Sequence, residues 1–313
     1  MSSCRRIKRL LETVDVASRL GGTRFSEALG LTSDFYANKS ADELWFHVPT
    51  KTLHVQVPLK ESILLSSNNS EIALSTFLTM IDDITSWALI LGDLKRGRGG
   101  VSIFLRNEWC STLSSGRLPG DVVEIQASVK KIGQNIGFVQ AQIKDVATGQ
   151  TVCRGSHIKY LPAGQIMDFM VSSYGWDLSK KYAHFRYPDS TPAKGPFARL
   201  FDSLQYPAND HATFQPHAHH ASFGGPLHGG CQAVLMELAA THYVQSQCQG
   251  PAQLQSIEIQ YMTRPSKKEV SLKSEIYPVA DGTSKGLQPV QVQLMSKNQE
   301  RSVGLLHFQP SSQ

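Results

Sequence analysis

The sequence predicts an α+β protein made of two tandem units, each a long helix followed by an antiparallel sheet that wraps around it. Three features of the 313-residue chain support this prediction. Apolar residues change from a helical spacing to alternation after about residue 100, the same change recurs after about residue 250, and a segment rich in Pro, Gly, Tyr and Asp separates the two regions. With 41% apolar residues, the chain is able to bury a core of this size.

The first unit opens with a predicted helix over residues 72–91. Its apolar residues recur at spacings of three and four, which places them on one face of about five helical turns. These residues are Leu74, Phe77, Leu78, Ile81, Ile84, Ala88 and Leu91. Alternation then predicts strands over 101–109, 122–132, 135–145 and 151–161, with a turn signal at Ala147-Thr148-Gly149 between the last two.

The second unit repeats this order of elements. A helix is predicted over 228–245 and strands over 254–262, 269–279, 289–297 and 301–308. Aligning Asp82 with Glu237 gives a repeat offset of 237 − 82 = 155 residues and places Trp109 against Tyr261. Each sheet needs a cover for its helix and its open edge, so we expect the two units to pair side by side.

Four segments follow from this reading: a basic N-terminal extension (1–40), a first domain (41–163), a connector (164–210) and a second domain (211–310). In the extension, Arg5, Arg6, Lys8 and Arg9 precede the first acid, Glu12, and the apolar residues share one helical face. Such a segment resembles a mitochondrial presequence, and the alternative is an amphipathic helix that packs on the body. The expected location is therefore mitochondrial or cytoplasmic.

Composition excludes several classes of protein. The net charge of 31 − 26 = +5 is spread along the chain, so no nucleic-acid partner is expected. No membrane span is expected, because the most apolar helix carries Asp82 and Asp83. The five cysteines are an odd count without a C-x-x-C pair, which predicts neither a disulfide framework nor a thiolate zinc site. The histidine cluster has no metal-ligand spacing, so no metal is expected; its members are His211, His217, His219 and His220.

The run from Met80 to Leu161, which includes GVSIFLRNEW, is similar to the small hotdog-fold acyl-CoA thioesterases of the phenylacetate-degradation type, including the human thioesterase-superfamily proteins. The second half resembles the same family through GGPLHGG, Glu237 and YMTRP, and together the two parts cover roughly 220 residues. The resemblance implies a double hotdog, in which two fused copies replace the family's dimer. It also implies an acyl-CoA or acyl-carrier substrate, no cofactor beyond the coenzyme A of that substrate, and further assembly of these pseudo-dimers into homo-oligomers.

Thioester hydrolysis needs a donor for the oxyanion and an acid that attacks the carbonyl or activates water. In the resembled family a glycine N–H at the start of the long helix is the donor, which matches Gly229 and Gly230 after His228. The acid lies eight residues after the first glycine, about 12 Å along the helix, so donor and acid must come from different helices. The resemblance therefore pairs Gly229 with Asp82, and it pairs Glu237 with Leu74, where no glycine stands. One working site per chain is expected.

Other residues match the family's site less closely. Ser102 stands where the family carries a serine that positions water, and Ser222 stands where it often has an asparagine. His228 is expected to shape the start of the helix or to act directly. Two alternatives stay open for the acids, since Asp83 could be the inward-facing residue of its pair and Glu237 could be paired within the interface.

The basic residues Lys95, Arg96 and Arg98 are candidates for contact with coenzyme A phosphates, and the alternative is a solvated loop.

Two other functions compete with the thioesterase. One is a hotdog dehydratase or hydratase that uses His219 or His220 with Glu237. The other is a non-catalytic scaffold or acyl-CoA-binding subunit of a larger complex, such as a mitochondrial one. Retention of Gly229, Asp82 and Ser102 at one composite site favours the thioesterase.

Overall fold

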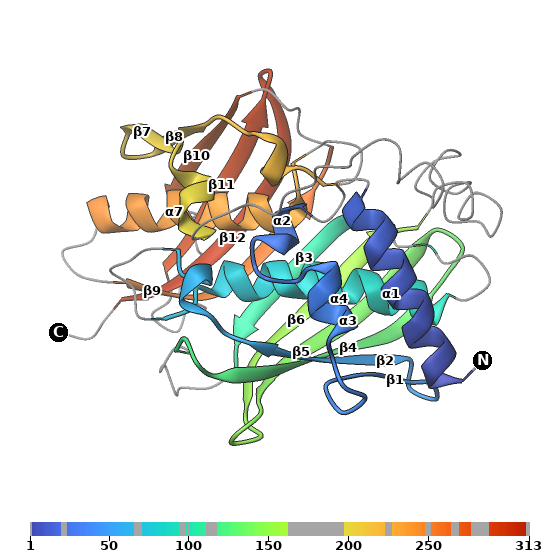
Figure 1. Cartoon of the computed structure of the whole chain (residues 1–313). Coiled ribbons are helices and arrows are strands. Elements are labelled where there is room, and N and C mark those ends of the chain that lie inside the picture. The colour runs from blue at the N-terminus through green and yellow to red at the C-terminus, as the bar shows by residue number, and fades with distance from the viewer. Residues whose placement is uncertain are drawn as a thin grey trace.

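Two long helices pack on one antiparallel sheet of twelve strands in the computed structural model (Figure 1). The structure describes residues 2–19, 24–65, 71–93, 98, 100–110, 118–161, 197–222, 227–247, 252–263, 269–276 and 288–310. The α-helices are α1 (Ser3–Arg19), α2 (Arg24–Glu27), α3 (Ser33–Ala37), α4 (Leu74–Gly92) and α7 (Gly229–Gln247). The 3-10 helices are η1 (Glu61–Ile63), η2 (Phe197–Phe201) and η3 (Ala218–His220).

The strands occur in the same order in each half of the chain. The first half contains β1 (Leu44–His47), β2 (Thr52–Pro58), β3 (Val101–Trp109), β4 (Val122–Ile132), β5 (Ile136–Asp145) and β6 (Thr151–Tyr160). The second half contains β7 (Gln205–Ala208), β8 (His211–Phe214), β9 (Ala252–Tyr261), β10 (Val270–Ile276), β11 (Gln288–Ser296) and β12 (Gln299–Pro310). In each half a hairpin precedes the long helix and four strands follow it.

The sheet order is β1-β2-β4-β5-β6-β3-β9-β12-β11-β10-β8-β7. Counted outward from the centre, the strands of the two halves occur in equivalent positions, from β3 and β9 at the junction to β1 and β7 at the edges. The junction is an antiparallel pairing in which Leu105 lies opposite Ile259. The indole of Trp109 also donates to the carbonyl of Leu254 across it, at 2.9 Å. The two halves therefore share one sheet.

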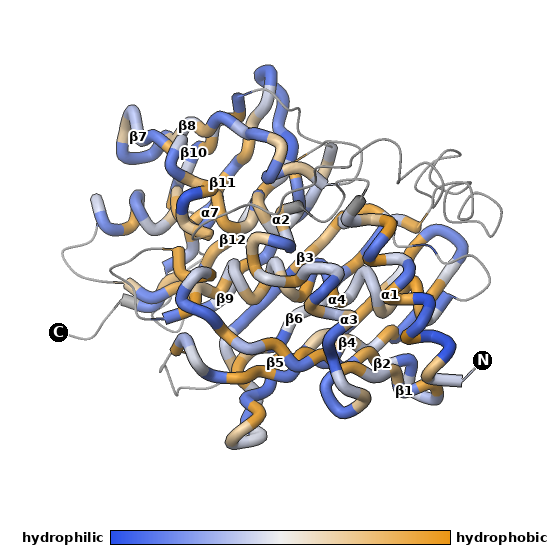
Figure 2. The backbone as a smooth tube through the Cα atoms, in the orientation of Figure 1, coloured by the Kyte–Doolittle hydropathy of each residue, from blue (hydrophilic) through white to orange (hydrophobic). Residues whose placement is uncertain are grey.

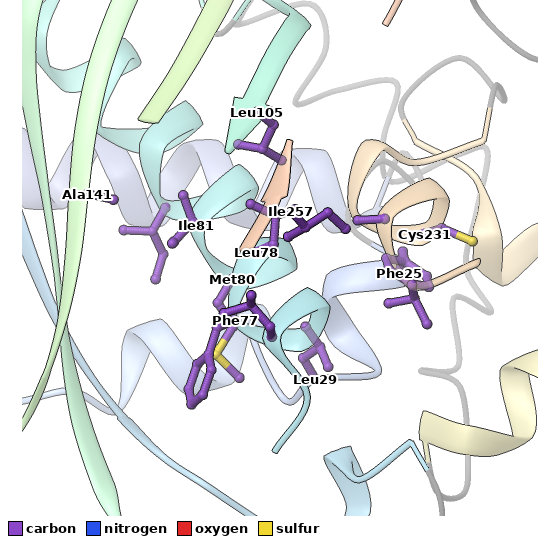
Figure 3. Packing of buried hydrophobic residues seen from close by; sticks show 14 of the residues in the cluster. Phe25, Leu29, Phe77, Leu78, Met80, Ile81, Leu105, Ala141, Cys231 and Ile257 are labelled. Carbon is purple, nitrogen blue, oxygen red and sulfur yellow. The ribbon is translucent and has the colours of Figure 1, made fainter. Parts of the chain in front are cut away.

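The inward faces of the strands and the two long helices form the core. In β4 the alternation seen in the sequence matches burial, since Val123, Ile125, Ala127 and Val129 are buried and the residues between them are more exposed (Figure 2). Figure 3 shows side chains of α4, among them Leu78 and Ile81, beside Leu105 of β3 and Ile257 of β9.

Helix α4 is, among the described residues, the one helix that is long and apolar enough to cross a membrane. Its apolar window is 94% buried inside the fold, where the sheet and α7 cover it. This burial accounts for its hydropathy, because a helix that is apolar on every side is also the pattern of a core helix.

The predicted helices and the strands β3–β6 and β9–β12 are confirmed, with ends within a few residues of those expected. The hairpins β1–β2 and β7–β8 were not predicted. Strands β1, β7 and β8 have only four residues each and carry little periodicity, whereas β2 alternates over seven residues and was missed. Residues 164–196 of the predicted connector lie outside the described residues, whereas its later part forms η2 and β7. The domain boundaries stay a prediction.

The N-terminal extension packs on the first half of the fold. Leu10 and Val14 of α1 are buried in the core, and the guanidinium of Arg6 donates to the carbonyl of Leu91 at the end of α4. The same guanidinium lies 5.0 Å from the centre of the Phe46 ring in β1. The amphipathic helix that packs on the body is thus what the structure shows, and targeting by this segment stays a prediction.

Candidate active site

Asp82, in the middle of α4, faces the first turn of α7. The Ser102 hydroxyl of β3 donates to Asp82 Oδ1 at 3.0 Å, and His228 Nδ1 lies 3.7 Å from Asp82 Oδ2. A Cβ atom added to Gly229 would stand only 2.8 Å from that same Oδ2 atom. The structure therefore brings together four of the residues selected from the sequence, and they come from both halves of the chain.

The first turn of α7 has little free space around its two glycines. A Cβ atom at Gly230 would lie 2.6 Å from side-chain atoms of Thr79 on α4, so the two helices approach closely here. Tyr261 Oη of β9 donates to the Gly229 carbonyl at 3.0 Å. His228 Nδ1 accepts the N–H of Gly230 at 3.0 Å and caps the helix. This contact assigns His228 the helix-shaping role.

Two residues of β6, His157 and Lys159, complete the surroundings of Asp82 and were not selected from the sequence. Lys159 Nζ lies 3.9 Å from Asp82 Oδ1, and His157 Nε2 lies 3.5 Å from it. Both side chains are buried. The available signal was a pair of polar residues at alternate, inward-facing positions of a predicted strand, but only the register of β3 with β6 shows that they reach Asp82.

A directed set of hydrogen bonds leads from His157 to Asp82. Burial lowers the pKa of His157 to about 3, and nearby Lys159 adds to this shift, so the ring is neutral and carries one N–H. Because the Ser102 hydrogen points to Asp82, the 2.9 Å contact between Ser102 Oγ and His157 requires the proton on Nε2. Nδ1 then faces the Thr85 hydroxyl at 2.6 Å. His157 holds Ser102 with its hydrogen toward the carboxylate.

The carboxylate of Asp82 is held in its charged form. Burial opposes ionisation, but the positive charge of Lys159 and the hydrogen bond from Ser102 lower its pKa below the ordinary value. Burial lowers the pKa of Lys159, and its ammonium group also donates to Ser86. Asp82 is therefore a buried anion at neutral pH.

Asp83, the neighbouring acid, points to a different environment. It is buried next to Ser26 and Glu27 of α2, and burial raises its pKa to about 7. The contacts with Ser102 and His228 belong to Asp82, so Asp82 is the acid that faces the glycines.

Glu237 has a different environment from Asp82, although the two positions are equivalent in the repeat. Its Oε2 atom accepts the N–H of Ser75, in the first turn of α4, at 2.8 Å. Helix α4 has no side-chain cap of its own because Ala73 stands at its N-cap, the position equivalent to His228. Glu237 therefore caps the opposite helix and occupies its Ser75 N–H donor. This matches the alternative of an acid paired within the interface.

We expect Glu237→Ala to lower the free energy of unfolding by about 2–4 kcal/mol, because it removes the acceptor of a helix N–H and leaves a cavity. Glu237→Gln should remain within about 1 kcal/mol of the wild type, since the amide oxygen still accepts this hydrogen bond without the cost of a buried charge. Urea unfolding followed by circular dichroism measures both variants. If the Ala and Gln variants have the same free energy of unfolding, the hydrogen bond between Glu237 and Ser75 does not stabilise the start of α4.

Among the described residues, the candidates Ser222 and Arg98 are not brought to Asp82. No hydrogen bond joins Ser222 to Asp82 or the glycines among the residues that the structure covers, and Lys95 and Arg96 lie outside that part. Arg98 is buried and donates to the Asp93 carboxylate at 2.8 Å and to the carbonyl of Gln134 at 2.6 Å. These bonds join Arg98 to the C-cap residue of α4 and to the turn between β4 and β5, which favours a structural role for Arg98.

The histidines near η3 form their own cluster. His220 Nε2 bonds to the Leu200 carbonyl at 2.6 Å, and its Nδ1 atom accepts the N–H of His217. In the described parts of the chain neither His219 nor His220 contacts Glu237, so the pair expected of a dehydratase is not assembled. Those parts also contain no group of three or more His, Cys, Asp or Glu residues placed to hold a metal ion.

Comparison with solved structures identifies the fold. The chain is similar to the 12:0-ACP thioesterase from Umbellularia californica (TM-score 0.56, 11% identity, 87% of this chain and 98% of that one). It is also similar to an acyl-ACP thioesterase from Bacteroides thetaiotaomicron (TM-score 0.51, 11% identity, 84% of this chain and 100% of that one). A third similar structure is a conserved protein of unknown function with a hot dog fold from Alicyclobacillus acidocaldarius (TM-score 0.53, 11% identity, 87% of this chain and 97% of that one). No family model and no curated protein sequence matches. The chain has the α+β hotdog fold.

Proposed function

We propose that the chain hydrolyses acyl thioesters at one composite site between two hotdog units fused in tandem. One observation carries this proposal: Asp82 and Ser102 of the first half face the glycine turn of α7 in the second half, with Asp82 charged and buried. A charged acid beside the start of a helix provides the two groups that thioester hydrolysis requires.

In this proposal the thioester carbonyl binds at the N-terminus of α7. The Gly229 N–H stabilises the oxyanion, helped by the positive end of the helix dipole. His228 occupies the next N–H, that of Gly230, and so leaves Asp82 free for chemistry. Asp82 attacks the carbonyl carbon or removes a proton from the water that attacks it, and Ser102 holds that carboxylate in place. In the first route the thiolate leaves, and water then hydrolyses the anhydride between Asp82 and the acyl group and supplies the proton of the thiol. In the second route the tetrahedral intermediate expels the thiolate, which takes the proton that Asp82 removed from water. Both routes release the thiol and the carboxylic acid.

The second composite position is closed in this proposal. The first turn of α4 has Leu74 and Ser75 in place of glycines, and the Ser75 N–H is taken by Glu237. A thioester oxygen would have to displace a carboxylate from that donor, which costs more than binding at an open site. One working site per chain follows.

Neighbours of the same fold support the substrate class. Two of the similar structures are acyl-ACP thioesterases, and the sequence resembles acyl-CoA thioesterases, so the proposed substrate is an acyl group on coenzyme A or an acyl carrier protein. The coenzyme A would be part of the substrate. Homo-oligomers of the fused unit and a mitochondrial or cytoplasmic location complete the proposal.

Release of free thiol from a panel of acyl-CoAs and acyl-ACPs tests the proposal. The panel contains short, medium, long and aromatic acyl groups, and the reaction is followed with a chromogenic thiol reagent. We expect turnover of at least one acyl class that rises linearly with protein concentration and is absent in an equally folded Asp82→Asn preparation. Absence of turnover with every acyl group would contradict it and favour the scaffold or acyl-CoA-binding alternative.

A further inference from the structure

We propose that Phe25, in the N-terminal extension, is a positioning residue of the composite site that keeps His228 neutral and in its capping orientation. This inference rests on the proposed function, because it assigns to the extension a part in the same site. It also gives a role to a segment that lies outside the two repeated units.

Phe25 joins the extension to the start of α7. Its ring is fully buried and lies 5.3 Å from the His228 ring, at an angle of 33°. The same ring contacts Phe197 at 5.4 Å and Phe201 at 6.2 Å, both in η2. Figure 3 shows Phe25 at the end of α7 that carries Cys231. Phe25 therefore packs on His228 and is itself held by an aromatic cluster from a second segment outside the repeat.

The chemistry of His228 makes this cover important. Nδ1 must be unprotonated to accept the N–H of Gly230, so the ring carries its proton on Nε2. Burial lowers the pKa of His228. The negative charge of Asp82 raises this pKa and the positive charge of Lys159 lowers it, so the pKa stays below the ordinary value. Phe25 supplies part of this burial by keeping water from the ring.

Protonation of His228 would disable the site in two ways. A proton on Nδ1 would break the cap on Gly230 and disturb the first turn of α7. The new N–H would also lie 3.7 Å from Asp82 Oδ2 and pair with the carboxylate that the reaction needs. Among the described residues, the groups that shift or share the charge of His228 are Asp82 of α4 and His157 and Lys159 of β6. Two further titratable residues lie beside it: His220 of η3 accepts the backbone N–H of His228 with its backbone carbonyl at 2.8 Å, and Tyr261 of β9 donates to the carbonyl of Gly229.

Phe25→Ala admits water to the ring, which favours the protonated form. The pKa of His228 should therefore rise, and activity should be lost on the acid side. We expect kcat/KM relative to the wild type to fall about tenfold at pH 6 and less than about twofold at pH 8. Titration of the His228 ring signals by NMR, assigned with His228→Gln, follows the same change without an assay of activity.

Two variants separate this role from loss of stability. Phe46→Ala removes a ring of similar burial that contacts Arg6 and lies outside the aromatic cluster, so it should leave the His228 titration and the pH profile unchanged. Phe25→Leu keeps an apolar side chain over the His228 ring and should restore much of the wild-type pH profile. If the Ala variant does not fold, the Leu variant is measured in its place.

The outcomes are distinct. A higher titration midpoint of His228 in Phe25→Ala, together with acid-side loss of activity, supports the inference. An unchanged titration, or a changed titration with an unchanged pH profile, overturns it. If the wild type turns over no thioester, the proposed function fails, and the NMR titration alone then decides whether Phe25 controls His228.

Discussion

Asp82→Asn is expected to lower kcat by about a thousandfold or more, which is the range for loss of a reacting carboxylate. Asparagine has nearly the same size and its oxygen still accepts from Ser102, but it carries no charge that can attack the carbonyl or take a proton from water. Lys159 also loses its charged partner at 3.9 Å. Initial rates at saturating substrate measure the loss, and circular dichroism checks that the variant folds.

The matched control for this experiment is Glu237→Gln, because the two acids occupy equivalent positions in the repeat. Glu237 caps Ser75, and its replacement by the neutral isostere should change kcat less than about threefold. The reverse pattern, with a large loss at position 237 and a small one at 82, would show that the working site is the other pairing.

The second large effect is expected from Gly229→Ala, which should lower kcat/KM by about a hundredfold or more. The added Cβ atom would lie 2.8 Å from Asp82 Oδ2 and 3.3 Å from Tyr261 Oη. Relief of this contact requires the carboxylate to move from the position that Ser102 and Lys159 fix, and the methyl group also occupies the side from which the thioester approaches. Steady-state kinetics with the best acyl substrate measures the loss.

A glycine outside the site provides the comparison. At Gly133, in the β4–β5 turn, a Cβ atom would meet one backbone oxygen at 3.3 Å and no atom of the site. Gly133→Ala should therefore keep wild-type kcat/KM. If Gly229→Ala also keeps it, the first turn of α7 does not bind the carbonyl, and the proposed mechanism is wrong.

Much of the fold was predictable because its main elements are long. The alternating residues of β4, a strand of 11 residues, give a clear period, and α4 continues its pattern for 19 residues. The repeat also indicated which acid faces which helix, since a helix fixes the distance between its own residues. The four-residue strands β1, β7 and β8 near the edges of the sheet lacked such a signal, whereas the alternation of β2 was present and was missed.

The composite site was predictable only in part. Asp82, Ser102 and Gly229 were selected from a resemblance to a family, and the structure brings them together. His157 and Lys159 were not selected, because the side chains of a strand reach a helix only through the strand register. Phe25 was also missed, since it lies 203 residues before His228 (228 − 25) and no local pattern connects them.

The sequence by itself determined the two long helices, the main strands and their repetition, because periodic apolar residues specify which face of each element is buried. Only the tertiary structure decided the state of each acid. Asp82 and Glu237 are equivalent by spacing, but His228 caps α7 and leaves Asp82 available, whereas Ala73 cannot cap α4 and Glu237 is used instead. The reason is physical: the N–H groups at a helix start need acceptors, and which side chain supplies them depends on contacts between elements far apart in the chain.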